Sequence, residues 1–261
     1  MSGTRILATM TIGRVSVMSE NGRDRVPHAY IDDLSRAGGI WPTSGTGGTG
    51  GAGRADGAGG AGSGTWWHAY RDVVPRWFET YLEVEPSASL VRVYEPEYVP
   101  GLLQTEDYAR ATIAAWHGGD PPERIERRVE LRMLRQRIVY RRPDPLRLWA
   151  VVDERALRAD VCDAATMRGQ IEHLLKMSAA PYVTLQVRPA TADAAPDPVC
   201  LLRVPDRAQP DVIYLERPAD ALYPDEPGVI RHYLTVLNGL MDEAPPPEAS
   251  AGILHRLLDT L

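Results

Sequence analysis

Hydrophobic residues in the second half of the chain follow two periods, and each period predicts one kind of element. Residues 146–152 are apolar on both alternating faces, which predicts a strand buried on both sides. Residues 183–188 alternate Val or Leu with polar side chains, which predicts a strand with one buried and one polar face. Two more short strands, 199–204 and 212–216, are joined by a short turn containing Pro and Asp, and this connection favours an antiparallel hairpin.

Apolar residues three or four positions apart predict helices before, between and after these strands. Pro121 and Pro122 suit the first turn of a long helix that reaches Tyr140. Asp163 is a suitable cap for the next helix, and two helices flank a break at 245–247. Helices before and after a small, mainly antiparallel sheet indicate an α+β domain.

The segment 66–81, called the aromatic segment below, is dense in Trp, Phe and Tyr. These side chains have helical spacing, and the basic residues between them are too few to suit nucleic-acid bases. Core packing is therefore favoured over a platform on which bases stack.

Residues 94–108, called the proline loop below, cannot lie inside a helix because Pro96 and Pro100 lack amide donors. Pro100 and Gly101 fit the central positions of a type II turn, in which glycine takes a positive φ. Thr105 is then expected to cap a helix, with these residues along one face: Tyr108, Ala111, Ala115 and Trp116. The loop thus predicts a rigid chain reversal, or alternatively only a join between two helices.

The composition fits a globular protein with extra segments. The chain has 261 residues, of which 44% are hydrophobic and 25% charged, with a formal net charge of −6. That charge argues against a surface generally basic enough for nucleic acid. No apolar run is long enough to span a membrane and no secretory signal is visible, so we expect a cytoplasmic protein. The two cysteines, Cys162 and Cys200, are expected to be reduced.

Residues 42–65 consist almost wholly of Gly, Ala, Thr and Ser, which predicts a flexible linker. It separates a short segment, 1–41, from a main domain, 66–261.

Candidate chemistry is sparse. Asp153 and Glu154 are adjacent carboxylates at a strand end, and they favour a hydrolase less than the start of a helix or an ion pair. The histidines have no metal-ligand spacing, and no nucleotide or nucleophile motif is present. The sequence therefore predicts neither an enzyme nor a cofactor.

Residues suited to recognition are more numerous. From Arg124 to Arg142 eight arginines face only two glutamates, which favours a solvated face, then a contact with an acidic partner, and least a contact with nucleic acid. Within it, Arg128, Arg132 and Arg135 are expected to contact such a partner. The proline loop and the strands supply the remaining recognition residues: Tyr94, Glu95, Tyr98, Gln104, Gln186, Tyr214 and Glu216.

Several of these segments resemble one family. They are the proline loop, the Trp-Trp-His start of the aromatic segment, the arginines near Gln136, and the strands 149–157, 181–189 and 211–216. Over residues 66–260 the chain resembles the C-terminal domain of unknown function that follows an Xre-type helix-turn-helix in actinomycete regulators, the WhiJ-like family.

This resemblance implies the effector domain of an antitoxin-like transcriptional regulator, which senses a ligand or a small acidic partner protein encoded nearby, and it allows a homodimer. Gly13 to Ser16 and His28 to Ile40 resemble the end of the helix-turn-helix domain. Only twelve residues precede Gly13, so we expect 1–41 to be a truncated remnant that cannot bind DNA alone. A hydrolase using Asp153 or Glu154 and a decayed, non-functional regulator are the alternatives.

Overall fold

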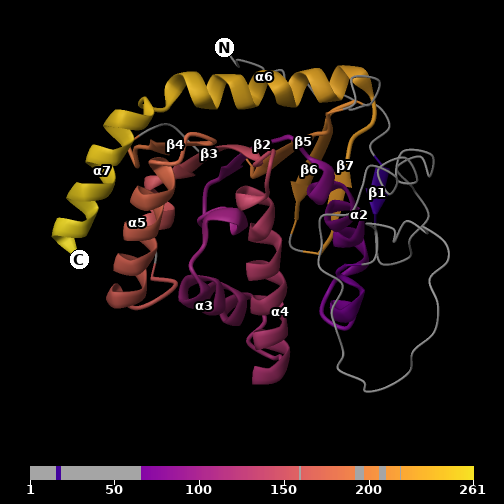
Figure 1. Ribbon diagram of the computed structural model, residues 1–261, viewed down its shortest axis with the longest axis horizontal. Coiled ribbons are helices and arrows are strands. Elements are labelled where there is room, and N and C mark those ends of the chain that lie inside the picture. The colour runs from indigo at the N-terminus through magenta and orange to yellow at the C-terminus, as the bar shows by residue number, and fades with distance from the viewer. Residues whose placement is uncertain (1–15, 19–65, 159, 192–196, 206–209, 218) are drawn as a thin grey trace, which may run out of the picture.

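The computed structural model describes the backbone of residues 16–18 and all atoms of 66–158, 160–191, 197–205, 210–217 and 219–261. The segment predicted as a helix-turn-helix remnant, apart from 16–18, and the predicted linker 42–65 lie outside the described residues. In the described part, helices cover both faces of one sheet (Figure 1).

The sheet has seven strands in the order β1-β7-β6-β5-β2-β3-β4. β2 pairs in parallel with β3, and β3 with β4, whereas the other four neighbouring pairs are antiparallel. The sheet is therefore mixed and mainly antiparallel, and the predicted α+β class is confirmed. The strands span β1 Ser16–Met18, β2 Leu90–Glu95, β3 Arg147–Asp153, β4 Val183–Arg188, β5 Val199–Arg203, β6 Val212–Glu216 and β7 Ala221–Tyr223.

The described helices lie before, between and after these strands. They are α2 Arg76–Val84, α3 Glu106–Trp116, α4 Pro122–Arg135, α5 Ala164–Ser178, α6 Pro227–Glu243 and α7 Pro247–Thr260. Short 3-10 turns add η2 His68–Tyr70, η3 Glu85–Ser87, η4 Gly101–Leu103, η5 Gln136–Tyr140 and η6 Glu154–Leu157. No described helix combines the length and the hydrophobicity that a membrane crossing requires.

The two faces of the sheet carry separate cores. α6 runs across one face, where Leu237 packs with Tyr94 and Ile213. α2 to α5 lie on the other face (Figure 1). On that second face Val93 and Cys200 lie in one cluster with residues of α2, α5 and α7. Because strand side chains alternate, neighbouring residues such as Tyr94 and Glu95 point into different environments.

Several local predictions are confirmed. The Asp163 side chain caps α5 by accepting from the Thr166 amide, and Thr105 caps α3 by accepting from the Tyr108 amide. β5 and β6 form the predicted antiparallel hairpin, and Trp67 and Tyr81 of the aromatic segment are buried in the core.

Other local predictions are wrong. β4 has no polar, solvated face, because the end of α6 covers Gln186 and its amide donates to the carbonyls of Met241 and Ala244. The long helix ends at Arg135 and continues to Tyr140 only as a 3-10 turn. Gly101 does not take a positive φ; it begins the 3-10 turn η4, so the predicted type II turn does not form.

Candidate functional site

The proline loop begins at the end of β2, and side-chain hydrogen bonds hold its backbone in place. Gln104 is buried, donates to the Val99 carbonyl at 2.7 Å and accepts from Nη1 of Arg132 at 2.6 Å. Gln136 donates to the carbonyls of Gly101 and Gln104 at 2.9 and 2.8 Å. These contacts leave little freedom to the loop backbone, so its side chains are held in fixed places.

The fully buried Gln170 of α5 adds two further bonds. Its Oε1 accepts from the Thr105 amide at 2.7 Å, and its Nε2 donates to the Leu103 carbonyl at 2.8 Å. One side chain thus satisfies two backbone groups at the start of α3, which supports the predicted rigid reversal.

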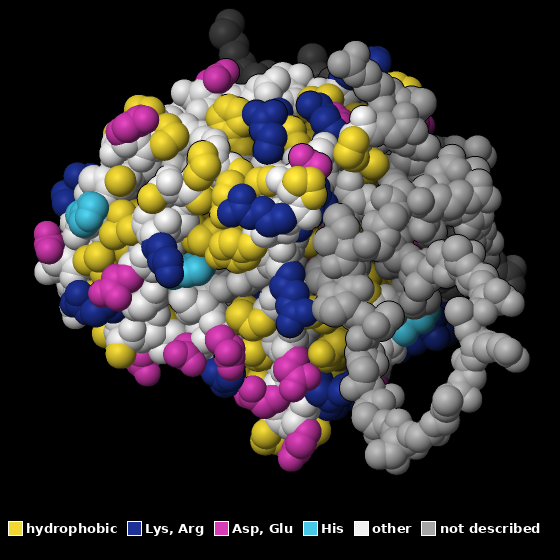
Figure 2. All heavy atoms as spheres, in the orientation of Figure 1, with side chains coloured by type: hydrophobic (Ala, Val, Ile, Leu, Met, Phe, Trp, Pro, Cys, Tyr) yellow, Lys and Arg dark blue, Asp and Glu magenta, His cyan; other side chains and the backbone are white. Residues whose placement is uncertain are grey.

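The arginines of α4 bind the aromatic segment. Arg127 forms an ion pair with Asp72 at 2.6 Å, and its guanidinium lies 5.3 Å from the ring centroid of Tyr70. Arg128 donates to the Val73 carbonyl and pairs with Asp120 at 3.1 Å. The surface in Figure 2 shows Lys and Arg side chains interspersed with acidic ones, with acidic side chains gathered at its lower edge.

Arg135 is buried against α2 and η3. It forms a bidentate ion pair with Glu85, and its guanidinium lies 5.0 and 5.1 Å from the ring centroids of Phe78 and Tyr81. Burial lowers the pKa of Arg135, but the charge of Glu85 outweighs it and the net shift is upward. The three arginines predicted to contact an acidic partner, Arg128, Arg132 and Arg135, therefore all have contacts within the chain.

Glu95 and Glu216 lie on one face at one end of the sheet. Val93 pairs with Cys200, and Cys200 with Tyr214, so these three side chains form a row across β2, β5 and β6. Two residues further along β2 and β6 come the two glutamates. The last pair between β2 and β5 is Tyr94 with Val199, so this carboxylate row lies beyond the start of β5.

The pKa values of Glu95, in the carboxylate row, and of nearby Arg132 are both shifted. Burial, followed by the negative charges of Glu216 and Glu97, raises the pKa of Glu95 to about 8, although the positive charge of Arg132 opposes the shift. Burial and the nearby Arg135 lower the pKa of Arg132 to about 10. Arg132 donates to Gln104 and forms no ion pair with a described carboxylate. Its positive charge therefore acts on Glu95 without a direct salt bridge.

Tyr214 lies beneath this row in a cluster of aromatic rings. Its ring centroid lies 4.7 Å from that of Tyr81, 5.4 Å from Tyr223 and 6.0 Å from Phe78. The side chain is 5% exposed, and its hydroxyl faces Glu216. Burial, followed by the charge of nearby Glu216 and a hydrogen bond with that carboxylate, raises its pKa well above the ordinary value.

Tyr94 and Gln186 lie on the other face of the sheet, away from this cluster. Tyr94 donates to Asp153 at 3.4 Å, and Asp153 also accepts from Arg155 at 2.8 Å and from Arg188 at 3.3 Å. Burial alone would raise the pKa of Asp153, but the bonds from Arg155 outweigh it and the pKa is lowered. Gln186 accepts from the Trp149 indole at 2.7 Å. Both predicted recognition residues are thus used in packing.

The carboxylates considered for hydrolysis are held ionised. Glu154 pairs with Arg158 at 2.7 Å and accepts from the Ala190 amide at 3.0 Å. Burial opposes these bonds, but the pKa of Glu154 is still lowered. Asp153 and Glu216 lie on opposite faces of the sheet, so they do not form one site. Among the residues that the structure describes, no three His, Cys, Asp or Glu side chains are placed to hold a metal ion.

A second surface lies at the end of α3. Tyr98 of the proline loop contacts Trp116 edge to face, with ring centroids 6.1 Å apart, and Trp116 is 53% exposed. The sequence placed Trp116 on the apolar face of this helix, but the buried face is Tyr108, Ala109, Thr112 and Ile113. We therefore missed Trp116, and its large exposed ring is a signal that only the structure provides.

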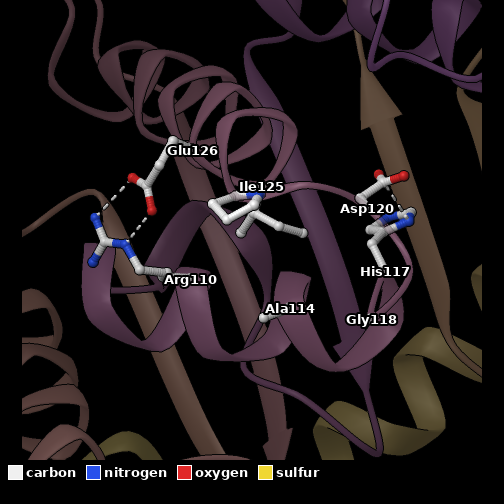
Figure 3. Close-up of a pocket in the computed structure, with 8 residues that line it drawn as sticks. Arg110, Ala114, His117, Gly118, Asp120, Ile125 and Glu126 are labelled. Atoms are coloured by element: carbon white, nitrogen blue, oxygen red, sulfur yellow. Dashed lines mark hydrogen bonds and ion pairs between the residues drawn. The ribbon is translucent and has the colours of Figure 1, made fainter.

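A shallow hollow of about 390 Å³ is lined by residues of α3, of α4 and of the segment between them, where His117 and Asp120 lie. Figure 3 shows Arg110 bonded to Glu126 at one end of it and His117 beside Asp120 at the other. Burial, followed by the positive charge of nearby arginines, lowers the pKa of His117. The positive charges that lower it belong to Arg128, Arg132 and Arg124, and the negative charge of Asp120 opposes them, so charges of both signs lie at the end of α3.

Comparison with known proteins gives one match. Residues 78–256, well over half of the chain, match a family described as a domain of unknown function (DUF5753). No curated protein and no solved structure matches the chain. The matched range includes the proline loop, α4 and the carboxylate row described above. The chain therefore belongs to the family described as a domain of unknown function, DUF5753.

Proposed function

We propose that residues 66–261 form the effector domain of an antitoxin-like transcriptional regulator of the Xre type, and that this domain binds a small acidic partner protein. The observation that carries the proposal is the exposed side chain of Trp116, which contacts the half-buried Tyr98 edge to face and lies next to His117, where arginines of α4 lower the pKa. Exposed Trp and Tyr side chains are enriched among the residues that dominate binding energy in protein interfaces. The arginines of α4 close to His117 would attract an acidic partner.

The design of the proline loop supports this assignment. Gln104, Gln136 and Gln170 fix the backbone of the loop, yet Tyr98 contacts the exposed Trp116. A rigid scaffold that presents an aromatic side chain lowers the entropy cost of binding. The resemblance to regulators of the WhiJ-like kind points to the same role.

The arginines of α4 contribute to this surface through their charge. The positive charges of Arg128 and Arg132 lower the pKa of His117. Their guanidinium groups bond to Asp120 and Gln104 within the chain. Replacing them would also loosen the aromatic segment or the proline loop. A substitution at Trp116 tests the partner contact without removing such internal bonds.

The test is calorimetric titration of the full chain with the small acidic protein encoded beside its gene. Trp116→Ala is expected to weaken binding at least about tenfold, as for an interface residue of high energy. Tyr140→Ala is the matched control, because Tyr140 is 49% exposed and belongs to η5. Equal losses in both variants, or no binding by the unchanged chain, would overturn the proposed partner contact.

The regulatory part of the proposal has its own measurement. Expression of the genes next to this one is compared in cells that lack the chain, carry it unchanged, or carry Trp116→Ala. Restoration by the unchanged chain and not by Trp116→Ala is the expected result. Unaltered expression in all three strains would contradict a role in transcription.

A further inference from the structure

We propose that the hollow between α3 and α4 anchors the acidic partner and fixes the direction in which the partner lies. An apolar residue of a partner helix enters the hollow, with an acidic residue of that helix toward His117 and a basic residue toward Arg110. This inference rests on the proposed partner contact and adds to it the part of the surface that sets orientation. Trp116, the residue that carries the proposed contact, directly precedes His117 in the chain.

The middle of the hollow is apolar. Ala114 of α3 and Pro122 of α4 line it and are exposed. Ile125 also lines it, is 8% exposed and packs with Ile113 and Val129 in a small core cluster. Figure 3 shows Ile125 between the charged pairs at the two ends. An apolar side chain that enters here removes apolar surface from water, which favours binding.

The end of the hollow at His117 carries an excess of positive charge. The carboxylate of Asp120 is shared by three cationic side chains: Arg128 lies at 3.1 Å, Arg124 at 3.7 Å and Nδ1 of His117 at 4.0 Å. Two guanidinium groups therefore surround this one carboxylate even when His117 is neutral. An acidic residue of a partner is attracted to this end.

The end at Arg110 carries the opposite excess. Arg110 forms ion pairs with three carboxylates, Glu106 at 2.7 Å, Asp107 at 2.9 Å and Glu126 at 2.7 Å. The side chains of Glu106 and Asp107 are 62% and 78% exposed. A basic residue of a partner can therefore reach them, and it is attracted by the unbalanced negative charge.

The distance between the two ends matches two turns of a helix. Arg110, Ala114 and His117 line the hollow and are four and then three positions apart, so they lie along one side of α3. At a rise of about 1.5 Å per residue, Arg110 and His117 lie roughly 10 Å apart along the axis. A partner helix with an acidic and a basic residue seven positions apart, and an apolar residue between them, has the same spacing. Opposite charges at the two ends favour one direction of this helix and oppose the reverse.

The anchoring role is tested by calorimetric titration of the full chain with the small acidic protein encoded beside its gene. Ala114→Gln places a longer, polar side chain over the hollow and should weaken binding at least about tenfold. Ala115→Gln is the matched control, because Ala115 is an exposed residue of the same helix that does not line the hollow. This control should lose less than about twofold in affinity.

The direction of the partner is tested with two changes of charge. His117→Glu adds a negative charge to the positive end, and Glu106→Lys adds a positive charge to the negative end. Each should weaken binding by about two- to fivefold, the effect of one exposed ion pair. Unchanged or tighter binding in either variant would overturn the fixed direction.

The outcomes separate this inference from the proposed partner contact. Thermal unfolding of each variant checks that it is folded before titration. Weaker binding in Trp116→Ala together with equal affinities in Ala114→Gln and Ala115→Gln would leave the partner contact standing and overturn the anchoring hollow. Absence of binding by the unchanged chain would overturn both.

Discussion

Arg135 and Glu85 form a buried bidentate ion pair that joins the arginine-rich helix α4 to the 3-10 turn η3, which follows α2. Nε of Arg135 lies 2.8 Å from Oε2 of Glu85, and Nη2 lies 2.8 Å from Oε1. The two side chains are 9% and 1% exposed. The sequence assigned the arginines of α4 to a partner surface. At least one of them instead forms an ion pair within the chain, with a residue fifty positions away.

Removing one partner of this pair should destabilise the domain strongly. Glu85→Ala leaves the guanidinium of Arg135 buried and unpaired, which costs about 3–5 kcal/mol. The double variant Glu85→Leu with Arg135→Met leaves no buried charge and should lose clearly less stability. Urea unfolding of the three proteins measures the difference. A double variant less stable than Glu85→Ala would contradict this account of the pair.

Gly101→Ala tests the conformation of the proline loop. A Cβ at this position would lie 3.2 Å from Cδ of Arg132, a flexible side chain that can shift by a few tenths of an ångström. Because Gly101 has no positive φ, the added methyl meets no backbone strain, and the cost should stay near about 1 kcal/mol.

The comparison for Gly101→Ala is Gly239→Ala in α6, where nothing lies within 4 Å of the new Cβ. This variant should be stabilised by about 0.5–1 kcal/mol, because alanine favours a helix interior. Unfolding free energies of both variants decide the matter. A loss of several kcal/mol of unfolding free energy in Gly101→Ala would indicate that Gly101 needs a positive φ, as in the type II turn predicted from the sequence.

The sequence predicts those parts of the fold that depend on local pattern. The strand at 147–153 is apolar on both faces, and the caps at Thr105 and Asp163 depend on contacts three residues away. β2 was missed because Leu90–Glu95 includes the two residues that the sequence assigned to the proline loop, Tyr94 and Glu95.

The site was predictable only in part, because its contacts cross long stretches of sequence. Glu95, Tyr214 and Glu216 come together through the register of β2, β5 and β6, which a single sequence does not reveal. Tyr94 was grouped with Glu95 although strand alternation sends it to the opposite face. Partners of the α4 arginines lie in the aromatic segment and in η3, and charge counting along one helix cannot identify them.

Gln170→Leu should loosen the proline loop without removing any of its residues. The change leaves the Thr105 amide and the Leu103 carbonyl without the bonds that Gln170 now makes, at 2.7 and 2.8 Å. Burying these unpaired groups costs about 1–3 kcal/mol each. Amide hydrogen exchange at Thr105 should accelerate more than exchange in α6, which lies on the other face of the sheet. Uniform acceleration across the domain would indicate global destabilisation instead.

Glu95→Gln should remove a pH dependence of stability. The pKa of Glu95 is about 8 in the folded chain and about 4.5 as its ordinary value, so the folded state holds an extra proton between these pH values. Stability of the unchanged chain therefore falls as pH rises from 4.5 to 8, and the glutamine variant should be more stable at pH 8 by on the order of 1–3 kcal/mol. Glu216→Gln should lower the pKa of Glu95, because the charge of Glu216 contributes to raising it. Urea unfolding at several pH values and carbon NMR titration of the Glu95 carboxyl measure both effects. Parallel stability profiles for the unchanged chain and Glu95→Gln would place the titrating proton on another group.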